Sequence, residues 1–380
     1  MHAVIVGAGT FGASLAWWLA RSGDEVTLVD QFEPGDPRTT SGGESRLLRS
    51  GHGADPEYTA SARRARALWR ELEAESGEDL YLECGLTWFA HRDDAWEALT
   101  APVLAAQGIP HQRLSPDEGA LLFPSWDPAG LLFLLHEPEA GIVRAQQAVQ
   151  ALVRQAAAHG ATIERGRATP EGATVRLEDG RVLDGDVVVW ACGAWLPKLF
   201  PDHVPVRPVL AELFFLDGGD AWRDPAIPAF VDLDAMFYGT HDLDGLGVKM
   251  APDFDGPPLD ADAPLPPAGA ARERATREAL AVRFPALADA PLAGAKTCRY
   301  ELSPDAHFVA APHPEHPSVW LLGGGSGHGF KHGPAVAERV AAALAGGEPL
   351  PPQFALHERG PAGTLRTAGA LDPASVGSRP

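Results

Sequence analysis

The sequence is poor in cysteine and in basic side chains. Its three cysteines, Cys84, Cys192 and Cys298, are odd in number and far apart in a chain too long to need covalent cross-links, so we expect no disulfide framework and a cytoplasmic location. Lysine and arginine total 31 against 51 aspartates and glutamates, a formal net charge of −20. Because such a charge repels nucleic-acid phosphates and anionic lipids, neither a nucleic acid nor a membrane is an expected partner.

Long apolar runs are also absent. The first residues form a strand-like run rather than the basic stretch of an export signal, and the apolar segment 11–20 is too short to span a bilayer. Glycine and proline are frequent, at 41 and 35 residues, but follow no collagen-like period, so they indicate many turns. With 380 residues, 45% of them apolar, the chain is long enough for two domains with full cores.

Hydrophobic periodicity predicts alternating strands and helices. Residues 3–30 have the pattern strand, glycine-rich turn, helix and strand, which is a βαβ unit. Short strands and turns alternate over 84–141 and 204–250. The stretch 252–267 holds six prolines and four aspartates, so we expect a surface loop there that could serve as a lid. Further helices are predicted over 58–76, 142–159, 272–284 and 334–344, a small meander over 161–186, and buried strands over 187–190 and 319–322.

The glycine-rich turn of the βαβ unit predicts a dinucleotide site. Gly7 permits the tight turn, Gly9 lets the backbone approach a pyrophosphate, and Gly12 lets the helix pack on the strand. Asp30, at the end of the second strand, is placed to accept hydrogen bonds from ribose hydroxyls. This pattern does not separate NAD from FAD.

Distant segments make the pattern more specific, and through them the chain resembles the monomeric sarcosine oxidase and N-methyltryptophan oxidase branch of the D-amino-acid-oxidase-like flavoenzymes. The resemblance runs from the N-terminus to about Leu344. The motifs that carry it are SRLLR at 45–49, CRY at 298–300 with PDAHF at 304–308, HPEH at 313–316, and SGHGFK at 326–331, beside the segments 186–195 and 323–325.

The resemblance implies an α/β fold, in an α+β arrangement of two domains: a Rossmann-type FAD-binding domain and a second, mostly antiparallel β-sheet domain that binds the substrate. The first domain is expected to be discontinuous, with segments 1–82, 142–203 and 296–356. The second takes 83–141 and 204–295, and 357–380 is expected to be a flexible tail.

The resemblance also implies roles for individual residues. In that family the cysteine that matches Cys298 forms a thioether to the 8α-methyl group of FAD, and the lysine that matches Lys249 lies over the flavin and promotes its reaction with oxygen. Arg46 matches a flavin-proximal arginine and Tyr238 an active-site tyrosine. The residues that match Arg49 and Lys331 hold the substrate carboxylate.

The chemistry of the same residues agrees with these roles but leaves alternatives open. A carboxylate is bound by a planar fork or a point cation, which Arg49 and Lys331 would supply, although both residue types usually lie solvated at the surface. Lys249, in an apolar strand, could instead be a snorkelling lysine at a sheet edge. Cys84 and Cys192 are expected to be small buried apolar residues.

The second glycine-rich segment, 323–331, follows a predicted strand and precedes a helix. We expect Gly325, Gly327, Gly329 and Lys331 to contact the cofactor, and the backbone amides of the loop and the helix N-terminus to stabilise negative charge on the flavin ring. Ser326 resembles a hydrolase nucleophile, but His328 stands where the closing glycine should be, so a loop residue is expected.

Two histidine pairs have spacings that could serve a metal ion, His313 with His316 and His328 with His332. No HExxH motif or cysteine pair accompanies them, so loop histidines are expected and no metal is predicted.

The chain departs from the sarcosine oxidases at positions that bear on the substrate. Ser41 and Gly42 replace two adjacent histidines, and Asp253 replaces an active-site histidine. The cavity should therefore be roomier and more acidic, and Asp253, or the acidic loop after it, should favour substrates with a second basic or polar group.

Together these observations predict an FAD-dependent oxidase, expected to be a soluble monomer, whose partners are an amino-acid-like amine and oxygen. A secondary or cyclic amine of an α-amino acid would pass a hydride to flavin N5, the imine would be hydrolysed, and oxygen would become hydrogen peroxide. A flavin-dependent dehydrogenase with another acceptor is the nearest alternative. An NAD-dependent dehydrogenase or a non-catalytic nucleotide-binding module gives no account of Cys298.

Overall fold

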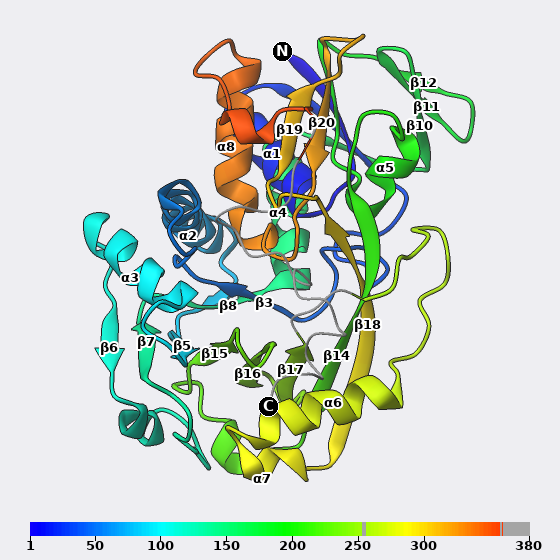
Figure 1. The fold of residues 1–380 in the computed structure, drawn as a ribbon. Helices are drawn as coiled ribbons and strands as arrows, with labels where there is room; N and C mark the ends of the chain where they lie inside the picture. Colours follow the sequence, from blue (N-terminus) through cyan, green and yellow to red (C-terminus); the bar gives the residue numbers. More distant parts are fainter. Residues whose placement is uncertain (253–255, 358, 360–380) are drawn as a thin grey trace.

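The computed structural model describes residues 1–252, 256–357 and 359. A parallel sheet with its helices forms one half of the molecule, and a larger, mostly antiparallel sheet forms the other (Figure 1). This is the predicted fold class. Among the described helices, none is both long and apolar enough to cross a membrane.

The parallel sheet has the strand order β19-β20-β13-β1-β2-β9. Five of its strands run parallel, and β19 pairs antiparallel at one edge. Because β1 is covered on both faces, alternate side chains enter different cores, with Ala3 and Ile5 on one side and Val4 and Val6 on the other. The strands are β1 (His2–Val6), β2 (Glu25–Asp30), β9 (Thr162–Arg165), β13 (Val187–Trp190), β19 (Val309–Pro312) and β20 (Val319–Gly323).

Helices cover one face of this sheet and a small meander covers the other. The core shared with Ala3 and Ile5 is formed by α1, α4, α8 and α2, while that shared with Val4 and Val6 includes the three-stranded meander. The elements are α1 (Thr10–Arg21), α2 (Pro56–Ser76), α4 (Ala145–Ala158), α8 (Gly333–Leu344), β10 (Ala168–Glu171), β11 (Thr174–Leu177) and β12 (Val182–Leu183), and α5 (Leu196–Leu199) follows β13.

The second sheet has the order β18-β14-β17-β16-β15-β5-β7-β6, and only the β15–β5 pair is parallel. An aromatic core that includes Phe89, Phe230 and Phe284 fills the space between this sheet and helices α6 and α7. The elements are β5 (Leu86–Ala90), α3 (Trp96–Ala106), β6 (Gln112–Leu114), β7 (Phe133–Glu137), β14 (Arg207–Leu216), β15 (Ala229–Asp232), β16 (Phe237–Asp242), β17 (Val248–Pro252), α6 (Ala270–Ala281), α7 (Pro285–Ala288) and β18 (Leu292–Leu302).

A third, three-stranded sheet lies where the two halves meet (Figure 1). It consists of β3 (Ser45–Leu48), β8 (Gly141–Arg144) and β4 (Tyr81–Leu82). It corrects one prediction, because the helix expected from residue 142 begins only at Ala145. Residues 141–144 pair with β3 and β4 instead, and this tertiary pairing outweighs their local helical pattern.

Three further details differ from the sequence-based picture. Helix α3 was not predicted, since Pro102 lies inside it. The domain boundary proposed at residue 296 falls inside β18, which pairs along its whole length with β14 and therefore belongs to the second sheet. Of the loop 252–267, Pro252 ends β17 and residues 256–267 contain no helix or strand. The predicted tail lies almost wholly outside the described residues.

Candidate functional site

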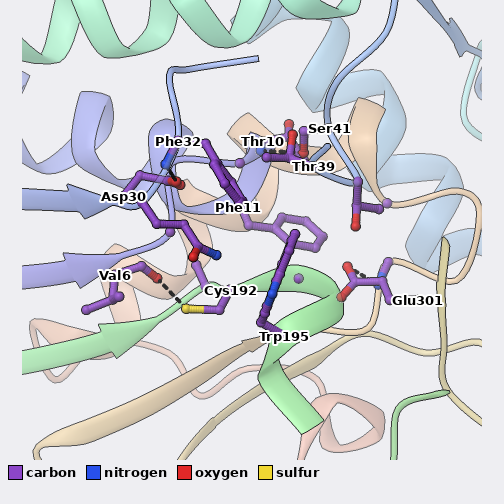
Figure 2. Close-up of a pocket in the computed structure, with 18 of the residues that line it drawn as sticks. Val6, Thr10, Phe11, Asp30, Phe32, Thr39, Ser41, Cys192, Trp195 and Glu301 are labelled. Carbon is purple, nitrogen blue, oxygen red and sulfur yellow. Dashed lines mark hydrogen bonds between the residues drawn. The ribbon is translucent and has the colours of Figure 1, made fainter. Parts of the chain in front are cut away.

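A cavity opens at the carboxyl ends of β1, β2 and β13, between the two halves of the molecule. Figure 2 shows Asp30 and Phe32 on one side of it and Glu301 on the other. Beyond Glu301 the cavity is lined by Arg46, Tyr300 and Phe330. The carboxyl edge of a parallel sheet is where open α/β folds bind nucleotides.

The first glycine-rich turn has the backbone that the dinucleotide motif requires. Gly7 has a φ of +106°, a region that residues with a side chain rarely adopt. A Cβ on Gly12 would lie 1.8 Å from the carbonyl oxygen of Gly7, so only glycine allows this contact between helix and turn. The N-cap of α1, Gly9, provides no side-chain cap, and the first turn of α1 holds no acid. This helix end is therefore suited to an anion such as a pyrophosphate.

Asp30 lies at the end of β2 and lines the cavity, as predicted. Its carboxylate accepts hydrogen bonds from the backbone amides of Ala8, at 2.6 Å, and Phe32, at 2.7 Å. Burial raises the pKa of Asp30 although both hydrogen bonds act in the opposite direction. The carboxyl group is thus oriented by the turn and can still accept from ligand hydroxyls.

Two polar atoms in the cavity wall have no hydrogen-bond partner among the described residues, Thr40 Oγ1 and Glu301 Oε2. The other oxygen of Glu301 accepts from the backbone amide of Gly325 at 3.1 Å. Burial raises the pKa of Glu301 to about 7. A buried polar atom without a hydrogen bond destabilises the folded protein. We therefore expect a bound group with hydroxyls between Thr40 Oγ1 and Glu301 Oε2. The hydroxyl-bearing linker of FAD fits this requirement, and sequence reasoning did not find Glu301.

The second glycine-rich loop also borders the cavity, which Gly325, Gly327 and Gly329 line, and its end contacts the start of α1, where Thr10 Oγ1 donates to the backbone oxygen of Phe330 at 3.1 Å. Ser326 holds this loop in place, because its hydroxyl lies 2.9 Å from the carbonyl oxygen of Gly324 and accepts from the amide of Ser303 at 3.0 Å. Ser326 is therefore a buried loop residue, as expected.

Lys249 lies on β17 with only 4% of its surface exposed. Its Nζ donates to the backbone oxygen of Ser45 at 2.9 Å and to the Ser45 hydroxyl at 3.1 Å. Burial, reinforced by the positive charge of Arg46, lowers the pKa of Lys249 to about 7. This burial excludes the snorkelling alternative.

Arg46, on β3, connects Lys249 with the cavity. Its guanidinium donates to the backbone oxygens of Thr40, at 3.0 Å, and Gly42, at 2.7 Å, and lies 5.7 Å from the ring centre of Phe330. The guanidinium also donates to the backbone oxygen of Ser45 at 2.8 Å, so three backbone oxygens of residues 40–45 orient it.

Cys298 and Tyr238 lie beside the same lysine. Cys298 is 7% exposed on β18 and packs with Tyr238 and Tyr300, whose hydroxyl oxygens are 2.7 Å apart. Burial raises the pKa of Cys298, while the charges of Arg46 and Lys249 act to lower it. The structure therefore brings together four predicted residues from four strands and two sheets: Arg46, Lys249, Tyr238 and Cys298.

The two predicted carboxylate-binding residues also approach each other. Lys331 is 3% exposed and its Nζ donates to the backbone oxygen of His328 at 2.9 Å, so it is not a solvated surface lysine. Burial, and then the nearby charge of Arg49, lower the pKa of Lys331 well below its ordinary value. The guanidinium of Arg49 lies 4.8 Å from the ring centre of Trp88 and 5.4 Å from that of Trp96.

A buried acid that sequence reasoning missed positions the loop after Arg49. The carboxylate of Glu137, at the end of β7, accepts from the backbone amides of Ser50, at 2.8 Å, and Gly51, at 3.1 Å, and from the indole of Trp88, at 2.7 Å. No sequence motif marks Glu137, because its three partners come from segments far along the chain. Asp253, predicted to contact the substrate, lies outside the described residues.

Comparison with known proteins agrees with this geometry. The chain is 29% identical over 357 residues to a monomeric sarcosine oxidase of Bacillus sp. (strain NS-129), covering 89% of this chain and 91% of that protein. It is 26% identical over 361 residues to an N-methyl-L-tryptophan oxidase of Yersinia pestis (strain Pestoides F), covering 92% and 95%.

Solved structures share the fold. An L-proline dehydrogenase from P. horikoshii has a TM-score of 0.82 at 21% identity, covering 93% of this chain and 95% of that one. Amadoriase I from Aspergillus fumigatus has a TM-score of 0.75 at 23% identity, covering 94% and 89%. The family model described as FAD dependent oxidoreductase matches residues 2–343. With this match and a cavity that fits the cofactor, the chain belongs to the family of FAD dependent oxidoreductases.

Proposed function

We propose that this protein is an amine oxidase that acts on secondary or cyclic amines of α-amino acids, with oxygen as the electron acceptor and hydrogen peroxide as a product. The observation that carries the proposal is that the fold brings the half-buried Arg49 close enough to the buried Lys331 for its charge to lower the pKa of that lysine. Lys331 directly follows Phe330, which lines the cavity. The relatives' printed names, sarcosine oxidase and N-methyl-L-tryptophan oxidase, support the same substrate class.

Bound FAD would supply the two-electron oxidant of the amine and the route of those electrons to oxygen. Gly7, Gly9, Gly12 and Asp30 would hold its nucleotide end, and Gly325, Gly327 and Gly329 its other end. We also propose that Cys298 attaches it covalently.

The protein's own groups would bind and orient the substrate. Arg49 and Lys331 would bind the carboxylate from two sides, which fixes the position of the amine relative to the cavity. A bound carboxylate would stabilise the ammonium form of Lys331 that burial disfavours. The rings of Trp88 and Trp96 would exclude water from the Arg49 side.

On the opposite side Lys249 would hold a proton at Nζ. Its pKa of about 7 allows both protonation states near neutral pH, and its hydrogen bonds to Ser45 fix the position of Nζ. A positioned ammonium group would stabilise negative charge that develops as oxygen is reduced. Tyr238, which is hydrogen-bonded to Tyr300, would lie next to Lys249 in the site.

The test is anaerobic mixing of the purified protein with a panel of N-methyl and cyclic amino acids, followed by admission of air. Loss of the yellow flavin colour without air, its rapid return with air, and one peroxide per turnover are the expected results. Reduction with slow return in air would identify a dehydrogenase with another acceptor. No reduction by any member of the panel would contradict the proposed substrate class.

We further propose that Asp253 selects substrates with a second basic or polar group. The variant Asp253→Asn should lose turnover of such substrates while retaining that of simple N-methyl amino acids, because only the former would pair with the carboxylate. Comparing kcat/KM across the panel for both proteins measures this. An unchanged order of preference would contradict it.

A further inference from the structure

Three histidines form a cluster outside the residues assigned above: the buried His52 and His332, and the half-buried His328. His52 lies between β3 and α2, His328 in the loop after β20, and His332 at the end of the short helix Phe330–His332. His52 and His332 are 1% and 0% exposed. One ring nitrogen from each lies within 4.8 Å of the other two. The sequence showed only the pair His328 and His332. The fold brings His52, from a distant segment, next to this pair.

Hydrogen bonds to backbone carbonyls determine which nitrogens carry a proton. His52 Nδ1 lies 2.9 Å from the carbonyl oxygen of Ser50, and His328 Nε2 lies 2.9 Å from that of Ala306. A carbonyl oxygen can only accept, so these two nitrogens donate. In a neutral imidazole the other nitrogen then carries a lone pair. The lone pair of His328 Nδ1 is thus left for another ligand, and that of His52 Nε2 faces His332 Nε2, 3.2 Å away.

His328 carries the unsatisfied nitrogen of this cluster. His328 Nδ1 is buried and has no hydrogen-bond partner among the described residues. An unpaired buried acceptor of this kind calls for a ligand.

The third ring, His332, supplies the third candidate metal-ligand atom. His332 Nδ1 lies 3.0 Å from the Ser61 hydroxyl, and His332 Nε2 lies 3.2 Å from His52 Nε2. In the tautomer in which Nδ1 donates to Ser61, the lone pair of Nε2 faces His52 Nε2. Ligands of a tetrahedral zinc ion, at about 2.0–2.1 Å from the metal, are about 3.3 Å apart. Histidines that bind metals commonly donate their other ring nitrogen to a carbonyl or a similar acceptor, as His52 and His328 do here.

We propose that His52 Nε2, His328 Nδ1 and His332 Nε2 bind one divalent transition-metal ion of the zinc type, with a fourth position open. The ion would join the loop that follows Arg49 to the segment that carries Lys331. If the function proposed above is right, it would therefore fix the distance between the two carboxylate-binding residues. Metal binding itself does not depend on that function.

The experiment is titration of the purified, flavin-containing protein with Zn²⁺ by calorimetry after chelator treatment and dialysis, repeated with Co²⁺ by visible spectroscopy. We expect one equivalent of Zn²⁺ per chain, and a tetrahedral Co²⁺ band at longer wavelength than the flavin absorption. His52→Gln and His332→Gln should each weaken binding on the order of 100-fold, and Ser61→Ala roughly 10-fold, because the last removes only a partner of a ligand. His159→Gln, at an exposed histidine, is the control.

Absence of stoichiometric Zn²⁺ binding by the unmodified protein would overturn the proposal, as would binding that His52→Gln and His332→Gln leave unchanged. If either histidine variant does not fold, the Co²⁺ spectrum of the unmodified protein and the Ser61→Ala titration decide the question. Peroxide formation is assayed separately, so failure of the metal site and failure of the proposed oxidase activity give different results.

Discussion

At the scale of single residues, Lys249 and Glu301 have pKa values near 7 for the same reason and with opposite consequences. Burial penalises the charged form of each, which lowers the pKa of the lysine and raises that of the acid. Lys249 was predicted because it matches a lysine of the family that the chain resembles, whereas Glu301 lies between the cysteine motif and the second glycine loop without a signal of its own. Only its unpaired oxygen in the cavity wall identifies it.

Replacement of Lys249 tests its proposed role with oxygen. Lys249→Met should slow reoxidation of the reduced enzyme by on the order of 100-fold, because a positioned positive charge is removed, and should change the rate of reduction by substrate much less. Stopped-flow measurement of the two half-reactions separates them. Lys296→Met, at an exposed lysine of β18, should change neither. Equal slowing of both half-reactions would assign Lys249 another role.

Replacement of Glu301 tests whether burial raises the pKa of its carboxyl group. Between its ordinary pKa of 4.5 and its folded value of about 7, the folded apoprotein holds a proton that the unfolded chain has lost, so the unfolding free energy should fall as pH rises through this range. Glu301→Gln carries no titrating proton and should make this fall smaller. Urea unfolding of the apoproteins at pH 4.5 and 7 measures it, with the exposed Glu178→Gln as control. Identical pH dependence in all three proteins would show that Glu301 is ionised normally.

At the scale of elements, strand ends and loops assemble the candidate substrate side. β7 supplies Glu137, which holds the backbone after β3, and that loop in turn carries Arg49 and His52. Helix α2 begins immediately after it, at Pro56, and the side chain of its N-cap residue, Asp55, accepts from the amides of Glu57 and Tyr58. The helix is predictable from sequence because its capping is local. The hydrogen bonds from the loop to Glu137 on β7 are not, because they join residues 86 or more apart.

Replacement of Glu137 tests this contact. In Glu137→Gln one acceptor oxygen becomes an NH₂ group that faces backbone N–H groups, so the unfolding free energy should fall by about 1–3 kcal/mol. The displaced loop should also raise KM more than it lowers kcat, since Arg49 would bind the carboxylate less well. Chemical denaturation and steady-state kinetics measure the two effects. Glu348→Gln, on the surface, provides the comparison, and a stable variant with normal KM would remove the positioning role.

At the scale of the whole molecule, the cavity joins the two halves. The first glycine turn belongs to the parallel sheet and Cys298 to the eight-stranded sheet, so a cofactor that reached both would connect them. Such a ligand stabilises the folded state by an amount that grows with its affinity and concentration. The family match establishes FAD as this cofactor but does not establish how it is attached.

Acid precipitation tests the covalent attachment. We expect the yellow colour to stay with the precipitated protein, and Cys298→Ala to release it into the supernatant, because the thioether sulfur is then missing. Cys84→Ala should retain the colour in the pellet. The released flavin is quantified by absorbance. Colour in the supernatant of the unmodified protein would withdraw the linkage and leave the fold and the cofactor unchanged.

The sequence by itself determined the elements and motifs that depend on local interactions. The βαβ unit, the turn from Gly7 to Gly12 and helix α2 follow from periodicity, glycine geometry and capping. The resemblance to a family singled out Arg46, Lys249 and Cys298 as candidate site residues. The tertiary structure alone decided which strand residues 141–144 join, that β18 crosses the expected boundary, and that Glu137, Glu301 and the three histidines lie next to their partners. Burial and long-range hydrogen bonds set these features, and both depend on residues far apart in the chain.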